Sequence, residues 1–161
     1  MNSKKLYIAY GSNLHRGQMA YRCPDAKPVG TAEITGYRMI FRGSSICAVA
    51  TIEPSLDHSV PVLLWEISPK DEQRLDVYEG WPRFYEKQDF SVEIGGEEVN
   101  AMAYVMTPGH ELGMPSAAYL NTIMEGYRQA GFEFDPLMEA LEYSEAQTAA
   151  PENAEQVNMD L

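Results

Sequence analysis

The sequence has 161 residues, of which 45% are hydrophobic and 22% charged, and its formal net charge is -12 at pH 7. This composition is ordinary for a globular protein, and the chain lacks the basic face that nucleic-acid binding requires. No apolar run approaches the roughly 18 residues of a membrane span, and the start lacks a secretory-signal core, so we expect a cytoplasmic protein with neither nucleic-acid nor membrane partners.

The first predicted strand covers Leu6–Tyr10 and ends at the turn-forming tripeptide Gly11-Ser12-Asn13. Residues 14–22 predict a short helix that is capped by Ser12 or Asn13 and stops before a proline. Backbone N–H groups converge where a helix begins, and Gly11 has no Cβ to keep a ligand away. The tripeptide therefore suits either a simple turn or a site for a carboxylate or phosphate oxygen.

The middle of the first half is rich in strand formers. Three stretches, Gly30–Phe41, Ser45–Thr51 and Val60–Glu66, predict strands. Gly36 interrupts the alternation of the first stretch and predicts a bend there. The segment Glu53–Asp57, which reads EPSLD, predicts a turn between the second and third strands.

The clearest predicted helix is the segment SPKDEQRLDVYEG, with Ser68 as its N-cap and Gly80 as its terminator. Glu79 lies in its last turn, where an acidic side chain opposes the helix dipole by about 0.3–1 kcal/mol. One interpretation is a solvated glutamate at the helix end, paired with Arg83. If Glu79 is buried among the neighbouring aromatic residues instead, its raised pKa would suit acid–base catalysis near neutral pH. Asp76 is a competing candidate that the sequence does not separate from Glu79.

The second half predicts a hairpin followed by two helices. Phe84–Ile94 and Val99–Met106 flank the turn GGEE, a helix opens at Pro115-Ser116, and residues 136–146 form a last helix. Strands and helices thus alternate without a repeating βα unit. This order predicts an α+β fold with a curved sheet or barrel.

The length and the lack of an internal linker favour one domain, residues 1–147. Eight of the 24 acidic residues, and no Lys or Arg, lie from residue 129 onward. We therefore expect residues 148–161 to form an acidic, disordered tail. Cys23 and Cys47 form no metal-ligand pattern, so the sequence predicts no metal site.

Two other functional interpretations stay open at this point. Ser12 and His15 could form a nucleophile–base pair, but no orienting acid is evident and the pattern is not that of a nucleophile elbow. The aromatic segment Tyr78–Tyr85 could instead be a surface for contact with another protein.

Several motifs, in their order along the chain, resemble the γ-glutamylcyclotransferase family. YGSNL at Tyr10–Leu14 resembles the signature loop of that family, and LDVYEG at Leu75–Gly80 resembles the segment that carries its catalytic glutamate. Tyr85 and the helix at Pro115–Gly131 also fit its pattern, and the resemblance spans about residues 6–132. It implies a small mixed β-barrel with flanking helices.

The resemblance also implies a reaction and a site. A γ-glutamyl amine, amide or peptide would close to 5-oxoproline and release its amine or amino acid, without a metal or an organic cofactor. Glu79 would be the general acid and base. The residues implied to bind the substrate are Tyr10, Gly11, Ser12, Asn13, Leu14, Tyr85 and Tyr119. The expected partner is the small γ-glutamyl substrate, and a homodimer is a further possibility. The alternative function is that of a non-catalytic binding protein with the same fold.

Overall fold

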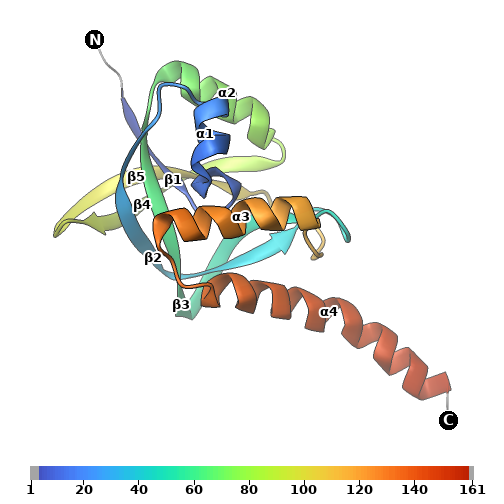
Figure 1. Ribbon diagram of the computed structural model, residues 1–161. Coiled ribbons are helices and arrows are strands. Elements are labelled where there is room, and N and C mark those ends of the chain that lie inside the picture. Colours follow the sequence, from blue (N-terminus) through green and yellow to red (C-terminus); the bar gives the residue numbers. More distant parts are fainter. Residues whose placement is uncertain (1–3, 160–161) are drawn as a thin grey trace.

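The computed structural model describes residues 4–159, and the side chains of residues 4–147. The described residues form a curled sheet with helices packed around it (Figure 1). The strands are β1 (Lys5–Ala9), β2 (Lys27–Arg42), β3 (Val49–Ile67), β4 (Tyr85–Ile94) and β5 (Glu97–Met106). The helices are the 3-10 turn η1 (Ser12–Leu14), α1 (Arg16–Arg22), α2 (Pro69–Glu79), α3 (Ala117–Ala130) and α4 (Asp135–Met159).

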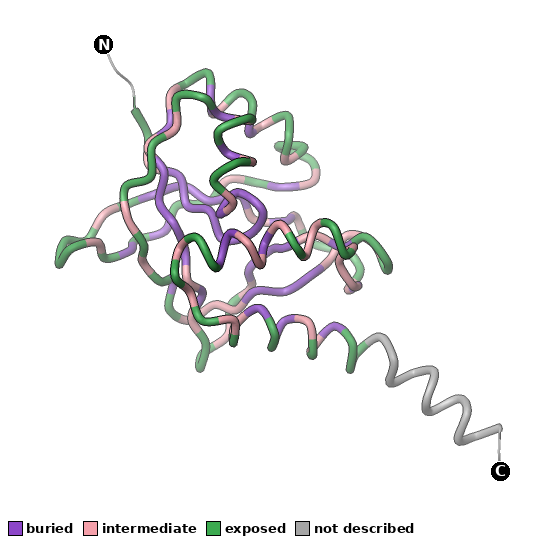
Figure 2. Tube along the Cα trace, in the orientation of Figure 1, coloured by how far each residue is buried: buried purple, intermediate pink, exposed green. Residues whose placement is uncertain are grey.

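The short strand β1 lies at the centre of the sheet, whose order is β2-β3-β1-β5-β4. It pairs antiparallel with β3 and parallel with β5, while β2–β3 and β4–β5 are antiparallel pairs. Burial is concentrated along these central strands (Figure 2). This mixed sheet with separate helices confirms the predicted α+β class.

The two edge strands approach each other because the sheet curls. The rings of Tyr37 on β2 and Phe90 on β4 meet edge to face, with centroids 5.3 Å apart. A Cβ added to Gly30 would lie 3.6 Å from Ile94 Cγ2. Side chains therefore fill the space between β2 and β4, but no hydrogen-bonded pairing joins these two strands within the described residues. The predicted barrel is thus a strongly curled sheet that does not close.

The predicted turn at Glu53–Asp57 is wrong, because β3 is one continuous strand. Its register with β2 shifts at this point: Thr35 pairs with Ser59 and Tyr37 with Pro54, so residues 55–58 stand opposite Gly36 alone. Turn-forming residues thus produce a protruding bulge instead of ending the strand. The bend predicted at Gly36 coincides with this shift, and its φ of 79° suits glycine.

The predicted helix over residues 14–22 begins later than expected. The chain first makes the turn η1, and α1 starts at Arg16. The cap is His15, whose Nδ1 accepts a hydrogen bond of 3.1 Å from Gln18 N–H, rather than Ser12 or Asn13. The side chain of Leu14 is fully buried, so packing fixes η1 and delays the helix.

The other helix ends follow the sequence signals. Ser68 forms a capping box with Asp71 at the start of α2, and Gly80 ends that helix in the left-handed conformation with φ 67°. Ser116 caps α3. The hairpin turns at Gly95 and Gly96, which both have positive φ.

The last helix is longer than predicted. α4 extends to Met159 and therefore covers most of residues 148–161, for which a disordered tail was expected. Alanine, glutamate and glutamine in this stretch are good helix formers. The side chains of the predicted tail lie outside the described residues. No helix in the described part of the chain is both long and apolar enough to cross a membrane.

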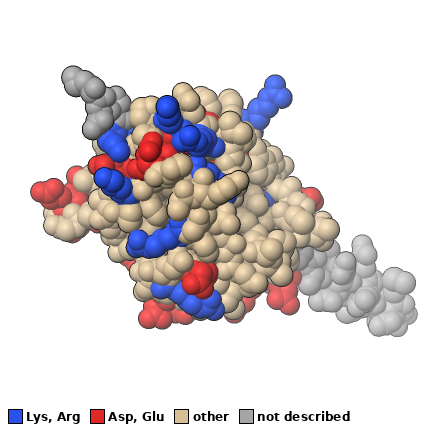
Figure 3. All heavy atoms as spheres, turned by 45° about the horizontal axis from the view of Figure 1, so that its top comes forward, with Lys and Arg blue, Asp and Glu red and all other residues tan. Residues whose placement is uncertain are grey.

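Charged side chains of both signs share the face that carries α1 and α2 (Figure 3). Glu72 on α2 lies 2.9 Å from Lys5 Nζ and 2.8 Å from Lys87 Nζ. Lys87 also lies 3.0 Å from Asp76. This network ties α2 to the sheet directly beside the site described next.

Candidate active site

A narrow polar cavity of about 30 Å³ lies where β1 ends, between η1 and the end of α2. Its wall is largely tyrosine, with one carboxylate. The lining residues are Tyr7, Ile8, Tyr10, Gly11, Ser12, Asn13, Ala50, Glu79, Tyr85, Tyr104 and Tyr119. The fold thus brings together the predicted turn and the predicted glutamate, which are far apart in sequence.

The loop after β1 is held in place by its carbonyl groups. Gly11 O accepts from Leu14 N–H and Ser12 O accepts from His15 N–H, both at 3.1 Å. The carbonyl of Asn13 accepts a bond of 3.1 Å from the indole of Trp65. The first N–H groups of a helical turn have no partner within that turn, so this loop can offer donors to an anion or a carbonyl oxygen.

Gly11 lies close to the opposite wall of the cavity. An added Cβ would lie 3.3 Å from Ala50 Cβ and 3.5 Å from the Tyr119 hydroxyl. A side chain here would therefore press on the cavity wall.

Glu79 is the carboxylate that faces this cavity. It is the last residue of α2, and Gly80 turns the chain away immediately after it. Burial raises the pKa of Glu79 to about 7, and the positive charge of Arg22 opposes part of that rise. Among the described side chains, Arg83 and the other cations form no ion pair with it. A group with this pKa can both accept and donate a proton near neutral pH.

Asp76, the competing carboxylate, has a different environment. It does not line the cavity. Its Oδ1 accepts a hydrogen bond of 2.6 Å from the Tyr104 hydroxyl and lies 3.0 Å from Lys87 Nζ. The structure therefore separates the two acids, since only Glu79 faces the cavity.

The tyrosine hydroxyls of the wall fall into two groups. Tyr10 and Tyr85 donate to the backbone carbonyls of Tyr104 and Ala50, at 2.6 and 2.5 Å, so their protons already have acceptors. The hydroxyl of Tyr119 instead accepts from Ala50 N–H at 3.0 Å, which leaves its own proton to donate.

Tyr7 belongs to the second group, because its hydroxyl accepts from Asn13 Nδ2 at 2.9 Å. Burial, together with the nearby Glu79 carboxylate, raises the pKa of the hydroxyls of Tyr7, Tyr10 and Tyr85. Burial likewise raises the pKa of the Tyr119 hydroxyl. All four hydroxyls are therefore protonated near neutral pH, and those of Tyr7 and Tyr119 are the ones free to donate to a ligand.

Arg22, at the end of α1, joins the loop to the end of α2. Its Nη1 donates to Asn13 Oδ1, and its Nη2 donates to Gln18 Oε1 at 2.9 Å. Its guanidinium lies 3.5 Å from the centroid of the Tyr78 ring, and the Tyr78 hydroxyl is 3.0 Å from Ser12 Oγ. The residue that moderates the pKa of Glu79 thus also fixes the loop.

Two alternatives can be compared with this geometry. Ser12 and His15 do not form a nucleophile–base pair, because Ser12 contacts Tyr78 and His15 caps α1. In the aromatic segment, Tyr78 and Trp81 are 44% and 42% exposed. Both rings carry a cation on one face, since Lys87 Nζ lies 4.0 Å from the Trp81 centroid and Arg22 covers Tyr78.

Most of the residues implied by the resemblance line the cavity. Leu14 does not, because its side chain is buried in the core, where the backbone of Gly126 packs closely against it. Four further residues that the motifs do not indicate also line the wall: Tyr7, Ile8, Ala50 and Tyr104. The parallel pairing of β1 with β5 places Tyr104 there, and no local pattern reveals such pairing. Among residues with described side chains, no group of three or more His, Cys, Asp or Glu is placed to hold a metal.

Comparisons with known proteins point in one direction. The family described as "Gamma-glutamyl cyclotransferase, AIG2-like" matches residues 7–126. The chain is 28% identical to human gamma-glutamylcyclotransferase over 148 residues, which cover 85% of this chain and 78% of the human protein. A solved "Gamma-glutamyl cyclotransferase" structure aligns with 27% identity and a TM-score of 0.75, over 91% of this chain and 88% of the other. YkqA from Bacillus subtilis shares the fold, with 19% identity and a TM-score of 0.73 over 89% of this chain and 55% of that protein.

Proposed function

The chain belongs to the gamma-glutamyl cyclotransferase, AIG2-like family of enzymes, and on that premise we propose that it converts a γ-glutamyl amine, amide or peptide to 5-oxoproline with Glu79 as the general acid and base. One observation carries the proposal. The carboxyl group with a pKa of about 7 lies in the same cavity as the Gly11-Ser12-Asn13 loop.

The proton transfers assigned to Glu79 balance within one turnover. Its carboxylate takes a proton from the α-ammonium group of the substrate, which frees the amine to attack the γ-carbonyl carbon. A nitrogen–carbon bond forms and closes the five-membered ring. The new ring nitrogen releases its second proton to solvent, the bond from the γ-carbon to the leaving nitrogen breaks, and Glu79 returns the first proton to the departing amine. A positioned acid–base group of this kind is worth about 10²–10⁴-fold in rate.

The loop and two hydroxyls suit the developing negative charge on the carbonyl oxygen. The first N–H groups of η1 and the hydroxyls of Tyr7 and Tyr119 are donors at the cavity wall. Removing one preorganised donor typically costs about 10²–10³-fold in rate. Tyr10 and Tyr85 would act differently, by fixing the strands that form the wall.

Because the nucleophile belongs to the substrate, the protein needs no nucleophilic serine or cysteine. Folding the γ-glutamyl chain so that its amine meets its own carbonyl supplies much of the rate, as in other intramolecular reactions.

The γ-glutamyl portion of the substrate is common to all these candidates, and a panel of substrates would identify the preferred leaving group. Wild-type protein incubated with γ-glutamyl amino acids, γ-glutamyl amines and glutathione would be assayed for 5-oxoproline by mass spectrometry. We expect product from at least one class, and the fastest member defines the leaving group. If no member yields product but one or more bind, the alternative of a non-catalytic binding protein replaces this proposal.

A further inference from the structure

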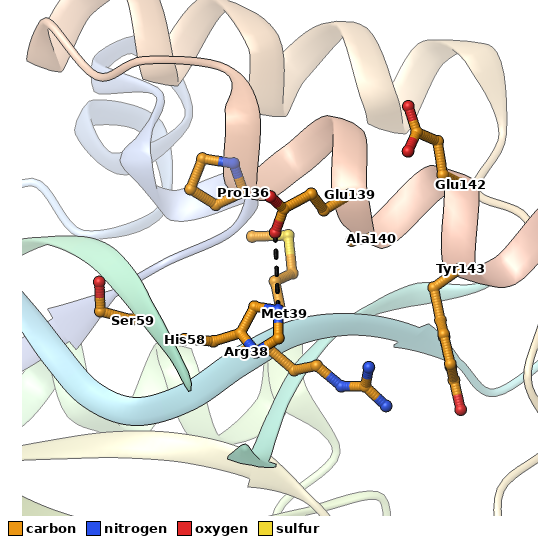
Figure 4. A pocket seen from close by; sticks show the side chains of 9 residues that line it. All are labelled: Arg38, Met39, His58, Ser59, Pro136, Glu139, Ala140, Glu142 and Tyr143. Carbon is orange, nitrogen blue, oxygen red and sulfur yellow. Dashed lines mark ion pairs between the residues drawn. The ribbon is translucent and has the colours of Figure 1, made fainter. Parts of the chain in front are cut away.

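A second cavity, of about 330 Å³, lies between the first half of α4 and the paired strands β2 and β3 (Figure 4). Its volume falls within the range of about 300–1,000 Å³ that is typical of small-molecule pockets. None of its lining residues also lines the cavity that contains Glu79. The mechanism proposed above makes no use of it.

Arg38 supplies an unused positive charge to this cavity. Among the described side chains, no acid forms an ion pair with it. Its Nε–H is buried and has no hydrogen-bond acceptor within the described residues. Arg42, four residues further along β2, is by contrast paired with Glu53 at 2.5 Å. A buried donor without an acceptor calls for a bound water, ion or ligand.

The rest of the wall combines one aromatic ring with aliphatic groups. The guanidinium of Arg38 extends toward Tyr143, and its Cζ lies 4.1 Å from the centroid of that ring (Figure 4). The ring keeps the guanidinium in place without neutralising its charge. Met39 and Ala140, which are both buried, and Pro136 complete an apolar surface beside it.

Two carboxylates at the rim limit the charge of any occupant. Glu139 lies 3.7 Å from His58 Nε2, and its side chain is 61% exposed. Glu142 is exposed on the next turn of α4. These acidic side chains disfavour an anion with two or more negative charges, such as a phosphate or a dicarboxylate, more strongly than an anion with a single charge.

We propose that this cavity binds a small organic monocarboxylate with an apolar body. The carboxylate accepts hydrogen bonds from the guanidinium of Arg38, whose planar fork matches it. The apolar body lies against the surface formed by Met39, Ala140 and the ring of Tyr143. Since α4 supplies one wall and β2 the other, such a ligand would join the last helix to the sheet.

The test uses the full chain and 3-phenylpropionate, with 3-phenyl-1-propanol as an uncharged probe of similar shape. Titrations followed by ¹H–¹⁵N correlation spectra give both the dissociation constant and the site. We expect the largest shifts at residues 38–39 and 136–143. The alcohol should bind about tenfold or more weakly than the acid, because it lacks the charged hydrogen bonds to Arg38.

Arg38→Met keeps the packing on Tyr143 and removes the charge. In this variant the acid should lose about tenfold or more in affinity, while the alcohol should change little. If that variant does not fold, Arg38→Lys replaces it, with a smaller loss because the charge is kept. The proposal is overturned by any of three results: no binding at millimolar acid, equal affinity for acid and alcohol in wild type, or shifts centred on Gly11 and Glu79.

Discussion

The hydroxyl of Tyr104 donates a hydrogen bond of 2.6 Å to Oδ1 of Asp76, three residues before Glu79 on the same helix. The same oxygen lies 3.0 Å from Lys87 Nζ. Asp76 is therefore part of the network that joins α2 to the sheet. Glu79, one turn later, faces the cavity formed with the Gly11-Ser12-Asn13 loop and has no ion-pair partner among the described side chains.

Because the two carboxylates have different environments, replacing each by its amide should affect kcat/KM differently. Asp76→Asn keeps an acceptor for Tyr104, so kcat/KM should fall by less than about tenfold. Glu79→Gln removes the proton acceptor and should cost about 10²-fold or more. Steady-state kinetics on the best substrate of the panel would compare them. Equal losses in the two variants would show that the structure has not separated the carboxylates.

The activity should depend on the ionisation of Glu79. In the proposed mechanism the carboxylate of Glu79 is the reactive form, so kcat/KM should rise with pH through an inflection near 7. Arg22→Gln removes the charge that opposes the rise in this pKa, so the inflection should move to higher pH. Arg128→Gln, which breaks an exposed ion pair with Glu125 on α3, is the matched control and should leave the inflection of kcat/KM unchanged. An unchanged inflection in Arg22→Gln would contradict this role.

Burial of Glu79 should also make stability depend on pH. The pKa of about 7 in the folded chain lies above the ordinary 4.5, so the folded state binds this proton more tightly. The contribution of Glu79 is thus most favourable below pH 4.5 and is lost as pH rises through about 7. Glu79→Gln has no carboxyl group to ionise, so its free energy of unfolding does not fall in this pH range. Because Glu79 is partly exposed, we expect the variant to be more stable than wild type by only about 1–3 kcal/mol at pH 8.

Urea unfolding at pH 4 and pH 8 would measure this difference. The two proteins should be close in stability at the lower pH and diverge at the higher one. Glu93→Gln, at an exposed position of β4, controls for a general effect of removing a charge. If the difference in free energy of unfolding between Glu79→Gln and wild type is the same at both pH values, the pKa of Glu79 is not raised by burial.

Gly11→Ala tests the closeness of the loop to the opposite wall. The added methyl would lie 3.3 Å from Ala50 Cβ and 3.5 Å from the Tyr119 hydroxyl. The contact with Ala50 is tighter than ordinary packing, so the methyl should displace the loop from the wall and KM should rise by roughly tenfold. Circular dichroism would check that the fold is kept. An unchanged KM would count against the loop as a substrate cradle.

The sequence predicted the elements whose signals are local. Ser68 and Gly80 define both ends of α2, and the paired glycines define the hairpin turn, because caps and turns depend on the residues that form them. The motifs YGSNL and LDVYEG identified the loop and the glutamate of the cavity. These motifs could not predict the rest of the cavity wall, because Tyr7 and Tyr104 come together only through the pairing of β1 with β5.

The turn predicted at Glu53–Asp57 fails for a tertiary reason. The segment after Glu53 has turn-forming residues, yet β2 pairs with β3 on both sides of it, and the excess residues become a bulge. Long-range pairing there overrides the local preference. The side chain of Leu14 packs in the core, so its assignment to the substrate site stays a prediction for its backbone amide.

The role proposed for Glu79 is tested most directly by the rate of 5-oxoproline formation in a single turnover, measured by mass spectrometry for wild type, Glu79→Gln and Asp76→Asn. We expect product from wild type and Asp76→Asn, and a loss of about 10²-fold or more in Glu79→Gln with unchanged substrate affinity. Near-normal turnover by Glu79→Gln would remove Glu79 from the mechanism and leave the cavity without its acid–base group.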